Sequence, residues 1–308
     1  MTVTTAQGTV RTAQPVQIKQ YTLAGVLGTW AAAALPMAAL AWLVAPWLAH
    51  KLDGPTALSR ALLLTLTAGL VWQFLLVLIL VYREQRSLRW RVLKEALWLH
   101  KPRRPKTGRR GGRAWLILIP VVFALAAEEL LPTLPTPGAR DFGLFLQSDS
   151  GQAFLSGNWG WFALLVTGFI FNTVLGEELL FRGLLLPRMQ GVFGRWDWAG
   201  NGVLFALYHL HVPWVIPQTF VDACVPYASK RYNSALVGIA AHSVQVEKGQ
   251  YHHRSRGQKI FPHRRFHSLG ADLPEERTGP ENGQSGQRSS ESAVAPNPTA
   301  GLPPRPRR

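Results

Sequence analysis

The sequence is poor in cysteine and in acidic residues, and both shortages restrict its function. The single cysteine, Cys224, excludes an internal disulfide, and without a CxxC pattern a structural zinc site or a redox pair has no support. The 308 residues include only 17 Asp and Glu against 33 Lys and Arg, a formal net charge of +16. In a soluble protein such an excess would indicate a nucleic-acid partner.

Three patterns are also missing. The sequence contains no His-Glu-x-x-His, which argues against the usual zincin arrangement. No internal repeat is visible, whereas many transporters consist of two related halves. The polar residues 1–20 are not followed by a short apolar core with a cleavage signal, so we expect no removable signal peptide.

The apolar residues occur in long blocks without charge, and the charges lie between the blocks. This pattern predicts an all-α, polytopic integral membrane protein with about five or six transmembrane helices, whose partner is the lipid bilayer and not nucleic acid. The run Ser234–Val246 is apolar but shorter than the roughly 20 residues needed to cross a bilayer. The other expected segments are Tyr21–Ala49, Ala57–Tyr82, Ala114–Leu131, Trp159–Leu175 and Asn201–His211.

The basic stretch Arg83–Arg113 sets the expected orientation. It holds twelve Lys and Arg and two acids. Since basic loops stay on the cytoplasmic side, we expect this loop and the N-terminus to be cytoplasmic, in the inner membrane if the cell is bacterial. Within the stretch, Leu88–Leu99 places apolar residues broadly on one side, which predicts an amphipathic helix at the membrane interface.

The stretch Leu175–Pro187 contains two adjacent carboxylates and an arginine inside an apolar run. On a helix, Glu178 and Arg182 share a face and can pair. Glu177 is turned about 100° away and has no such partner in its own helix. A charge at membrane depth is costly and usually functional, which makes this stretch the candidate site. A second pair, Glu128-Glu129, lies at the end of a span, where we expect the interface to solvate it.

Three motifs follow one another in order. Leu175–Pro187 contains Glu-Glu-x-x-x-Arg, Phe205–His209 reads Phe-x-x-x-His, and His242 matches the histidine of His-x-x-x-Asn. Together they resemble the CAAX-protease and bacteriocin-processing family of intramembrane proteases, over roughly Trp159 to Gln245. The chain departs from the family pattern at Val246, where the family has Asn or Asp.

The resemblance implies roles for these residues. Glu177 and His209 would activate a water molecule, and His242 would stabilise the oxyanion. Glu178 would be committed to Arg182, and Phe205 would hold the His209 ring in place by packing. His211, two positions further on, is expected to point elsewhere on the helix. A metal-free mechanism without cofactors is implied; zinc held by Glu177, His209 and His242 is the alternative.

The implied function is endoproteolysis of a membrane-associated peptide or protein, with glutamate-activated water. Family substrates are prenylated C-terminal tails in eukaryotes and bacteriocin precursors or unknown peptides in bacteria. The alternative is a catalytically impaired membrane scaffold or immunity-type binding protein, which Val246 supports. On these grounds we expect four regions. They are a polar segment (1–20), two transmembrane helices with the basic loop (21–113), the intramembrane protease core (114–246) and a disordered basic tail (247–308).

The end of the protease core coincides with an abrupt change in composition. The apolar run stops short, the third motif fails at Val246, and polar, Pro- and Gly-rich sequence follows. We interpret the residues after about Gln245 as the product of a reading-frame change or recombination. Translation of the gene's other two frames from that point tests this interpretation.

Overall fold

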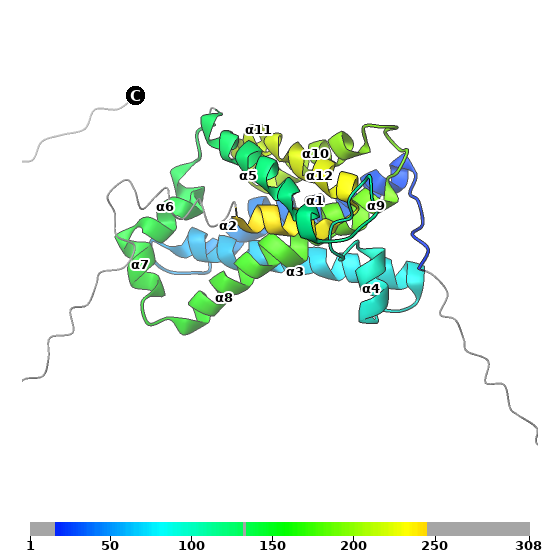
Figure 1. Ribbon diagram of the computed structural model, residues 1–308. Coiled ribbons are helices and arrows are strands. Elements are labelled where there is room, and N and C mark those ends of the chain that lie inside the picture. The colour runs from blue at the N-terminus through cyan, green and yellow to red at the C-terminus, as the bar shows by residue number, and fades with distance from the viewer. Residues whose placement is uncertain (1–15, 132–133, 245–308) are drawn as a thin grey trace, which may run out of the picture. The chain divides into compact units, whose positions relative to one another are not determined.

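The computed structural model describes residues 16–131 and 134–244. Within these ranges the regular elements are helices, and the β-structure consists of isolated bridges (Figure 1). This confirms the predicted all-α fold class. The expected polar N-terminus falls mostly outside the described residues, and the expected disordered tail falls outside them entirely.

Within the described residues, three helical segments are long and apolar enough to cross a membrane. The first, Leu23–Ala49, combines α1 (Leu23–Ala39), the π-helical η1 (Leu40–Val44) and α2 (Ala45–Ala49). The second is α3 (Ala57–Gln85). The third, Trp159–Arg188, continues from α8 (Trp159–Ile170) through the candidate motif. These segments lie where the apolar blocks predicted spans, and the chain is an integral membrane protein.

The remaining expected segments are shorter. The third expected span corresponds to the apolar helix Gly112–Ala126, which combines the 3-10 helix η2 (Gly112–Ile117) with α5 (Leu118–Ala126). A second 3-10 helix, η3 (Ala127–Leu130), follows it. The last apolar helix is described from Ala235 to Val244, and the end of the apolar run predicted at Val246 lies outside the described residues. The other helices are α6 (Phe142–Gln147), α7 (Asp149–Leu155), α10 (Asp197–Tyr208), α11 (Ile216–Thr219) and α12 (Cys224–Tyr232).

The expected interfacial helix Leu88–Leu99 is only partly correct. The helix there, α4, covers Trp90–Ala96. It ends because Trp98 adopts a left-handed backbone conformation, with φ of 50°. Leu97 is then buried in the protein core. The end of this segment therefore packs against protein, because a backbone turn that periodicity does not encode redirects it.

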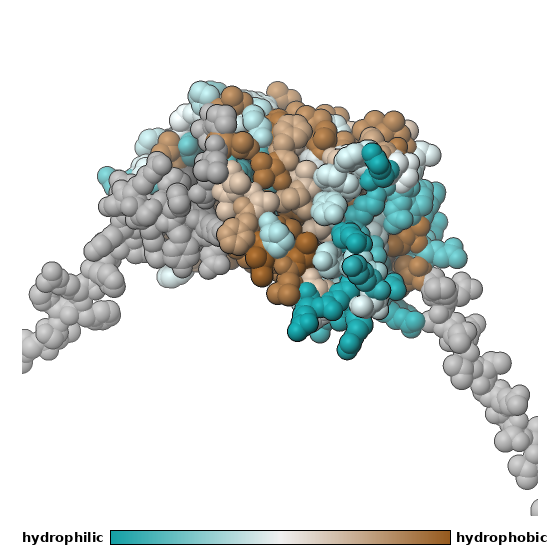
Figure 2. Space-filling model, turned by 45° about the horizontal axis from the view of Figure 1, so that its top comes forward, coloured by the Kyte–Doolittle hydropathy of each residue, from teal (hydrophilic) through white to brown (hydrophobic). Residues whose placement is uncertain are grey.

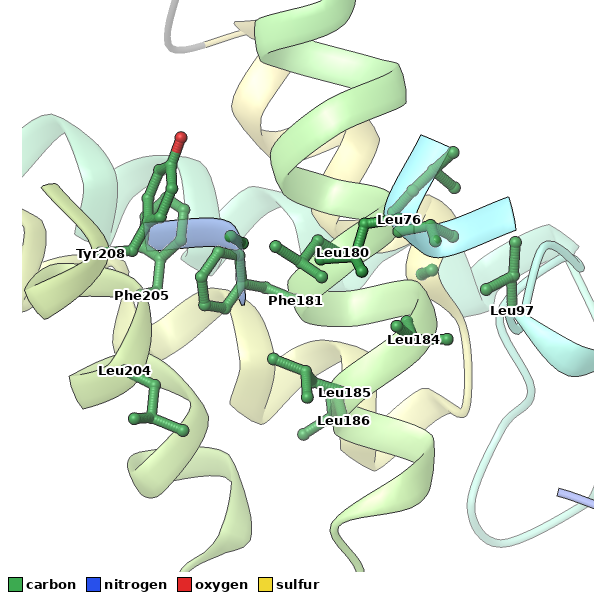
Figure 3. Close-up of a cluster of buried hydrophobic side chains, with 14 of the residues drawn as sticks. Leu76, Leu97, Leu180, Phe181, Leu184, Leu185, Leu186, Leu204, Phe205 and Tyr208 are labelled. Atoms are coloured by element: carbon green, nitrogen blue, oxygen red, sulfur yellow. The ribbon is translucent and has the colours of Figure 1, made fainter. Parts of the chain in front are cut away.

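The core surrounds the candidate motif. Figure 3 shows Leu180, Phe181 and Leu184 among buried side chains of several helices. Their neighbours come from α3 (Leu76), from the residue after α4 (Leu97) and from α10 (Leu204, Phe205, Tyr208). Large apolar side chains also remain exposed on the surface, which Figure 2 shows as broad hydrophobic areas beside a hydrophilic one. A bilayer would cover such areas.

A buried ion pair joins the ends of two spans. The fully buried Arg188, at the end of the third span, pairs with Glu84 of α3 at 2.8 Å. Tyr21 donates to Glu84 over 2.6 Å, and its own backbone N–H donates to the carbonyl of Arg188. Burial and the hydrogen bond to Glu84 raise the pKa of Tyr21, which keeps its hydroxyl a donor. The start of α1 and the ends of α3 and of the third span therefore meet on one side.

The basic loop lies on the same side. Arg188 Nη1 donates to the carbonyl of Ala96, near the start of the loop. The Ser234 hydroxyl donates to the carbonyl of His100 over 2.6 Å, and the Ala235 N–H donates to the carbonyl of Trp98 over 3.0 Å. The last apolar helix consequently starts from the loop side and carries His242 into the bundle.

Candidate active site

The two acids of the motif lie between two π-helical stretches. The first, η5, covers Phe171–Gly176, and the second, η6, covers Leu179–Leu185, before α9 (Leu186–Arg188) ends the segment. π-helical turns are rare, and they occur frequently at functional sites. Glu177 and Glu178 are 3% and 1% exposed. The structure thus holds two carboxylates inside the protein at the middle of a membrane span.

Glu178 is held from two sides. Its Oε1 lies 3.2 Å from Arg182 Nη1, which is the i,i+4 pair expected from the spacing. The same oxygen lies 3.4 Å from His242 Nδ1, on the last apolar helix. One carboxylate therefore links the first motif to the third, although the two are far apart in sequence.

Glu177, unlike Glu178, is not held by an ion pair within the described residues. Within the described residues, its carboxylate makes neither an ion pair nor a hydrogen bond, and it interacts electrostatically with His242, Arg182 and Tyr208. The two neighbouring acids point in different directions, as expected for adjacent helical residues. Glu177 is thus a buried carboxylate of the first motif that is available to a water molecule or a substrate.

Phe205 connects the second motif to the first. The Arg182 guanidinium lies over its ring, 4.0 Å from the centroid, and the ring also packs edge-on against Phe181 and against His209. Its carbonyl oxygen lies 3.0 Å from His209 Nδ1. Because a carbonyl only accepts, Nδ1 carries the proton in the neutral ring, and Nε2 is left as an acceptor. The packing role expected for Phe205 is observed.

The expectation for His211 was wrong. This residue was expected to point away from His209, but the two rings stack with centroids 5.6 Å apart. The reason is that α10 ends at Tyr208 and residues His209–His211 form a 3-10 turn, so α-helical angles do not apply. The sequence signal for this change was Pro213, which follows the turn.

Sequence reasoning missed Asp222, which lies in a 3-10 turn between α11 and α12. Its side chain is 6% exposed and interacts electrostatically with Glu128, Arg182 and His242. Glu128 was expected at a solvating interface; it is partly buried and acts on Asp222. An acid inside the apolar run Trp214–Tyr227 was the signal that could have identified Asp222.

Sequence reasoning also missed Gln73 of α3. Its side chain is fully buried and donates to the hydroxyl of Tyr208. This bond joins α3 to the end of α10, directly before His209. Gln73 is a polar residue in the middle of a span. Polar side chains at membrane depth are costly and usually functional, and the same rule identified Glu177 and Glu178 as candidates.

Gly238 lets the last helix approach Glu178. A Cβ at this position would overlap Glu178 Oε2 and lie 3.1 Å from Arg182 Cγ. Gly238 stands one helical turn before His242. Only a residue without a side chain therefore permits the contact between Glu178 and His242.

A metal ligand set was the alternative use of Glu177, His209 and His242. Across residues 16–131 and 134–244, no group of three or more His, Cys, Asp or Glu side chains is placed to hold a metal ion. The expectation of a metal-free site stays a prediction.

Comparison with known proteins concerns the second half of the chain. Residues 152–245 match the family model described as Rce1-like, type II CAAX prenyl endopeptidase. No curated protein and no solved structure matches the chain significantly. The matched residues contain the first two motifs and His242 of the third, and they end at Gln245; Val246 follows the matched range and lies outside the described residues.

Proposed function

We propose, from the match of residues 152–245 to the Rce1-like model of type II CAAX prenyl endopeptidases, that the chain is an intramembrane endopeptidase. It hydrolyses a peptide bond in a membrane-associated substrate with water activated by glutamate. The observation that carries the proposal is the buried Glu177 carboxylate, which has no ion pair within the described residues, beside Glu178, which has two. One acid is thereby positioned and the other is available for chemistry.

The first step is activation of water. A water molecule between Glu177 and His209 gives its proton to the Glu177 carboxylate, while His209 Nε2 accepts a hydrogen bond from it. The hydroxide attacks the carbonyl carbon of the substrate, and a negative charge forms on the carbonyl oxygen. General base catalysis of this type contributes about 100-fold to 10,000-fold in rate.

The second step is stabilisation of that charge and collapse of the intermediate. His242 faces Glu178 through Nδ1, so a protonated ring can donate from Nε2 to the oxyanion. Glu177 then returns its proton to the leaving nitrogen, the C–N bond breaks, and the site regains its initial charge. Arg182 remains paired with Glu178 throughout and acts as a positioning residue.

The test uses peptides that carry a C-terminal lipid. Purified protein in vesicles is incubated with a prenylated peptide and with the same peptide without the lipid, and the products are separated by mass. We expect cleavage of the lipidated peptide. Cleavage of neither peptide across a panel of sequences would favour the alternative, a non-catalytic membrane scaffold, which the absence of Asn at 246 supports.

Metal removal is expected to leave the activity unchanged. The described residues offer no three-ligand cluster, and the proposed mechanism uses carboxylate and imidazole alone. The measurement is cleavage before and after a strong chelator, together with elemental analysis for zinc. One zinc per chain, lost together with activity, would move Glu177, His209 and His242 into ligand roles.

Gly238→Ala is expected to lower cleavage by about 10- to 100-fold, because an added Cβ separates the last helix from Glu178 and misplaces His242. The matched control is Gly160→Ala in α8, where a Cβ meets nothing within 4 Å. Both variants are assayed at equal amounts of folded protein. Equal activity of the two variants would show that the close approach at Gly238 does not position the site.

A further inference from the structure

A cavity lies at the end of the bundle where the basic loop meets α12. Its volume is about 360 Å³, and it is lined by residues 103–108 of the loop together with Arg231 and Asn233. Four of the lining side chains are cationic: Arg103, Arg104, Lys106 and Arg231. No acidic side chain is among the lining residues.

The positive charge of the cavity is not neutralised by nearby acids. Across the part of the chain that the structure describes, none of the four cations forms an ion pair. The usual excess of basic residues in cytoplasmic loops explains the net charge of the loop. It does not explain why cations from two separate segments line one cavity.

The loop that forms the cavity is held in place by its own backbone. Arg104 N–H donates to the carbonyl of Arg109, and Gly108 N–H donates to the carbonyl of Arg104, both over 2.9 Å. Gly108 has φ of +68°, and a Cβ there would lie 3.2 Å from an Arg103 guanidinium nitrogen. A glycine therefore permits both the turn and the approach of Arg103. The cavity is largely formed before any ligand arrives.

The cavity is also connected to the helix that carries His242. Arg103 N–H donates to the carbonyl of Tyr232 over 2.8 Å, at the end of α12. The bonds of Ser234 and Ala235 to the loop follow directly, and the last apolar helix begins there. A ligand in the cavity would thus bind at the base of the segment that reaches the candidate active site.

We propose that this cavity binds the phosphate group of an anionic ligand. Guanidinium and ammonium groups are the side chains that bind phosphate, arginine by paired N–H bonds. The cavity lies on the side where α3 and the third span end, and the ends of membrane spans lie close to lipid headgroups. A phosphate there can belong to an anionic phospholipid, since basic pockets beside membrane helices bind such headgroups, or to a soluble phosphate compound. The proposal does not depend on the protease function.

The test measures binding to purified full-length protein. One arm titrates nanodiscs containing phosphatidylcholine alone or together with phosphatidylglycerol, and reads retained lipid by native mass spectrometry. The second arm titrates inorganic phosphate and glycerol 3-phosphate against the protein in phosphatidylcholine alone. Retention of phosphatidylglycerol assigns a lipid headgroup, and saturable binding of the soluble probes assigns a free phosphate ligand.

The decisive variant is Arg104→Gln/Lys106→Gln/Arg231→Gln. Its matched control is Arg89→Gln/Arg91→Gln/Lys94→Gln, which removes the same charges from exposed positions on and next to α4, outside the cavity. We expect the cavity variant to bind at least about tenfold more weakly and the control to bind as the wild type does. An equal loss in both variants would reduce the effect to general surface charge and overturn the proposal. Unchanged binding in both variants, or no binding of any probe to the wild type, would overturn it as well.

Discussion

Glu177→Gln is expected to lower peptide hydrolysis by about 100-fold or more, with little change in the amount of folded protein. The amide keeps the shape of the side chain and cannot accept the proton of water. Because Glu177 makes no ion pair within the described residues, its neutralisation breaks no structural contact there. The measurement is the initial rate of cleavage together with the yield of monodisperse protein.

The control for this variant is Glu128→Gln. Glu128 belongs to the other Glu-Glu pair of the chain and lies in a 3-10 turn after α5. It is partly buried near Asp222, and the proposed mechanism gives it no role. We expect near-normal cleavage from it. If Glu177→Gln cleaves as fast as Glu128→Gln does, Glu177 is not the base.

Arg182→Ala is expected to destabilise the protein by about 3–5 kcal/mol, because it leaves the Glu178 carboxylate buried without its principal cation. Both side chains of the pair are 1% exposed, so solvent cannot replace the lost contact. His242 also faces Glu178, but its Nδ1 is the more distant partner, at 3.4 Å. The measurement is the loss of folded protein in detergent as temperature or denaturant increases.

The double variant Arg182→Ala/Glu178→Gln separates charge from packing. Removing the orphaned charge should restore part of the stability, while the guanidinium packing on Phe205, at 4.0 Å from the ring centroid, stays lost. A fully stable Arg182→Ala protein would mean that the pair contributes nothing at this depth. If the double variant is no more stable than Arg182→Ala, the loss of stability comes from lost packing alone and not from the unpaired charge.

Much of the fold was predictable because one physical rule dominates in a membrane. Uncharged apolar blocks in a membrane have to become helices. This rule predicted spans at Tyr21–Ala49, Ala57–Tyr82 and Trp159–Leu175, and the structure has helical segments at Leu23–Ala49, Ala57–Gln85 and Trp159–Arg188. The same rule identified Glu177 and Glu178 as candidate site residues, because they are charges inside an apolar run. The i,i+4 spacing on a helix predicted the pair of Glu178 and Arg182. Local periodicity was thus sufficient for the elements and for the contacts within one helix.

The contacts between helices were not predictable in this way. Nothing in the spacing of Glu84 and Arg188 indicates that they meet, because the pair depends on how α3 packs against the third span. The same holds for His242 and Glu178, whose contact depends on the close approach at Gly238. Asp222 was missed for the same reason, because tertiary packing is what buries it near Arg182. Turns such as His209–His211 depend on backbone changes that periodicity does not encode.

The central claim is that this membrane site hydrolyses peptide bonds through Glu177. The most direct test incubates a lipidated peptide in vesicles with equal amounts of wild-type and Glu177→Gln protein and identifies every product by mass. We expect, for the wild type alone, two fragments whose masses sum to the substrate plus one water. Peptide that is retained by both proteins and recovered intact from both would contradict it, and would identify the chain as a binding protein.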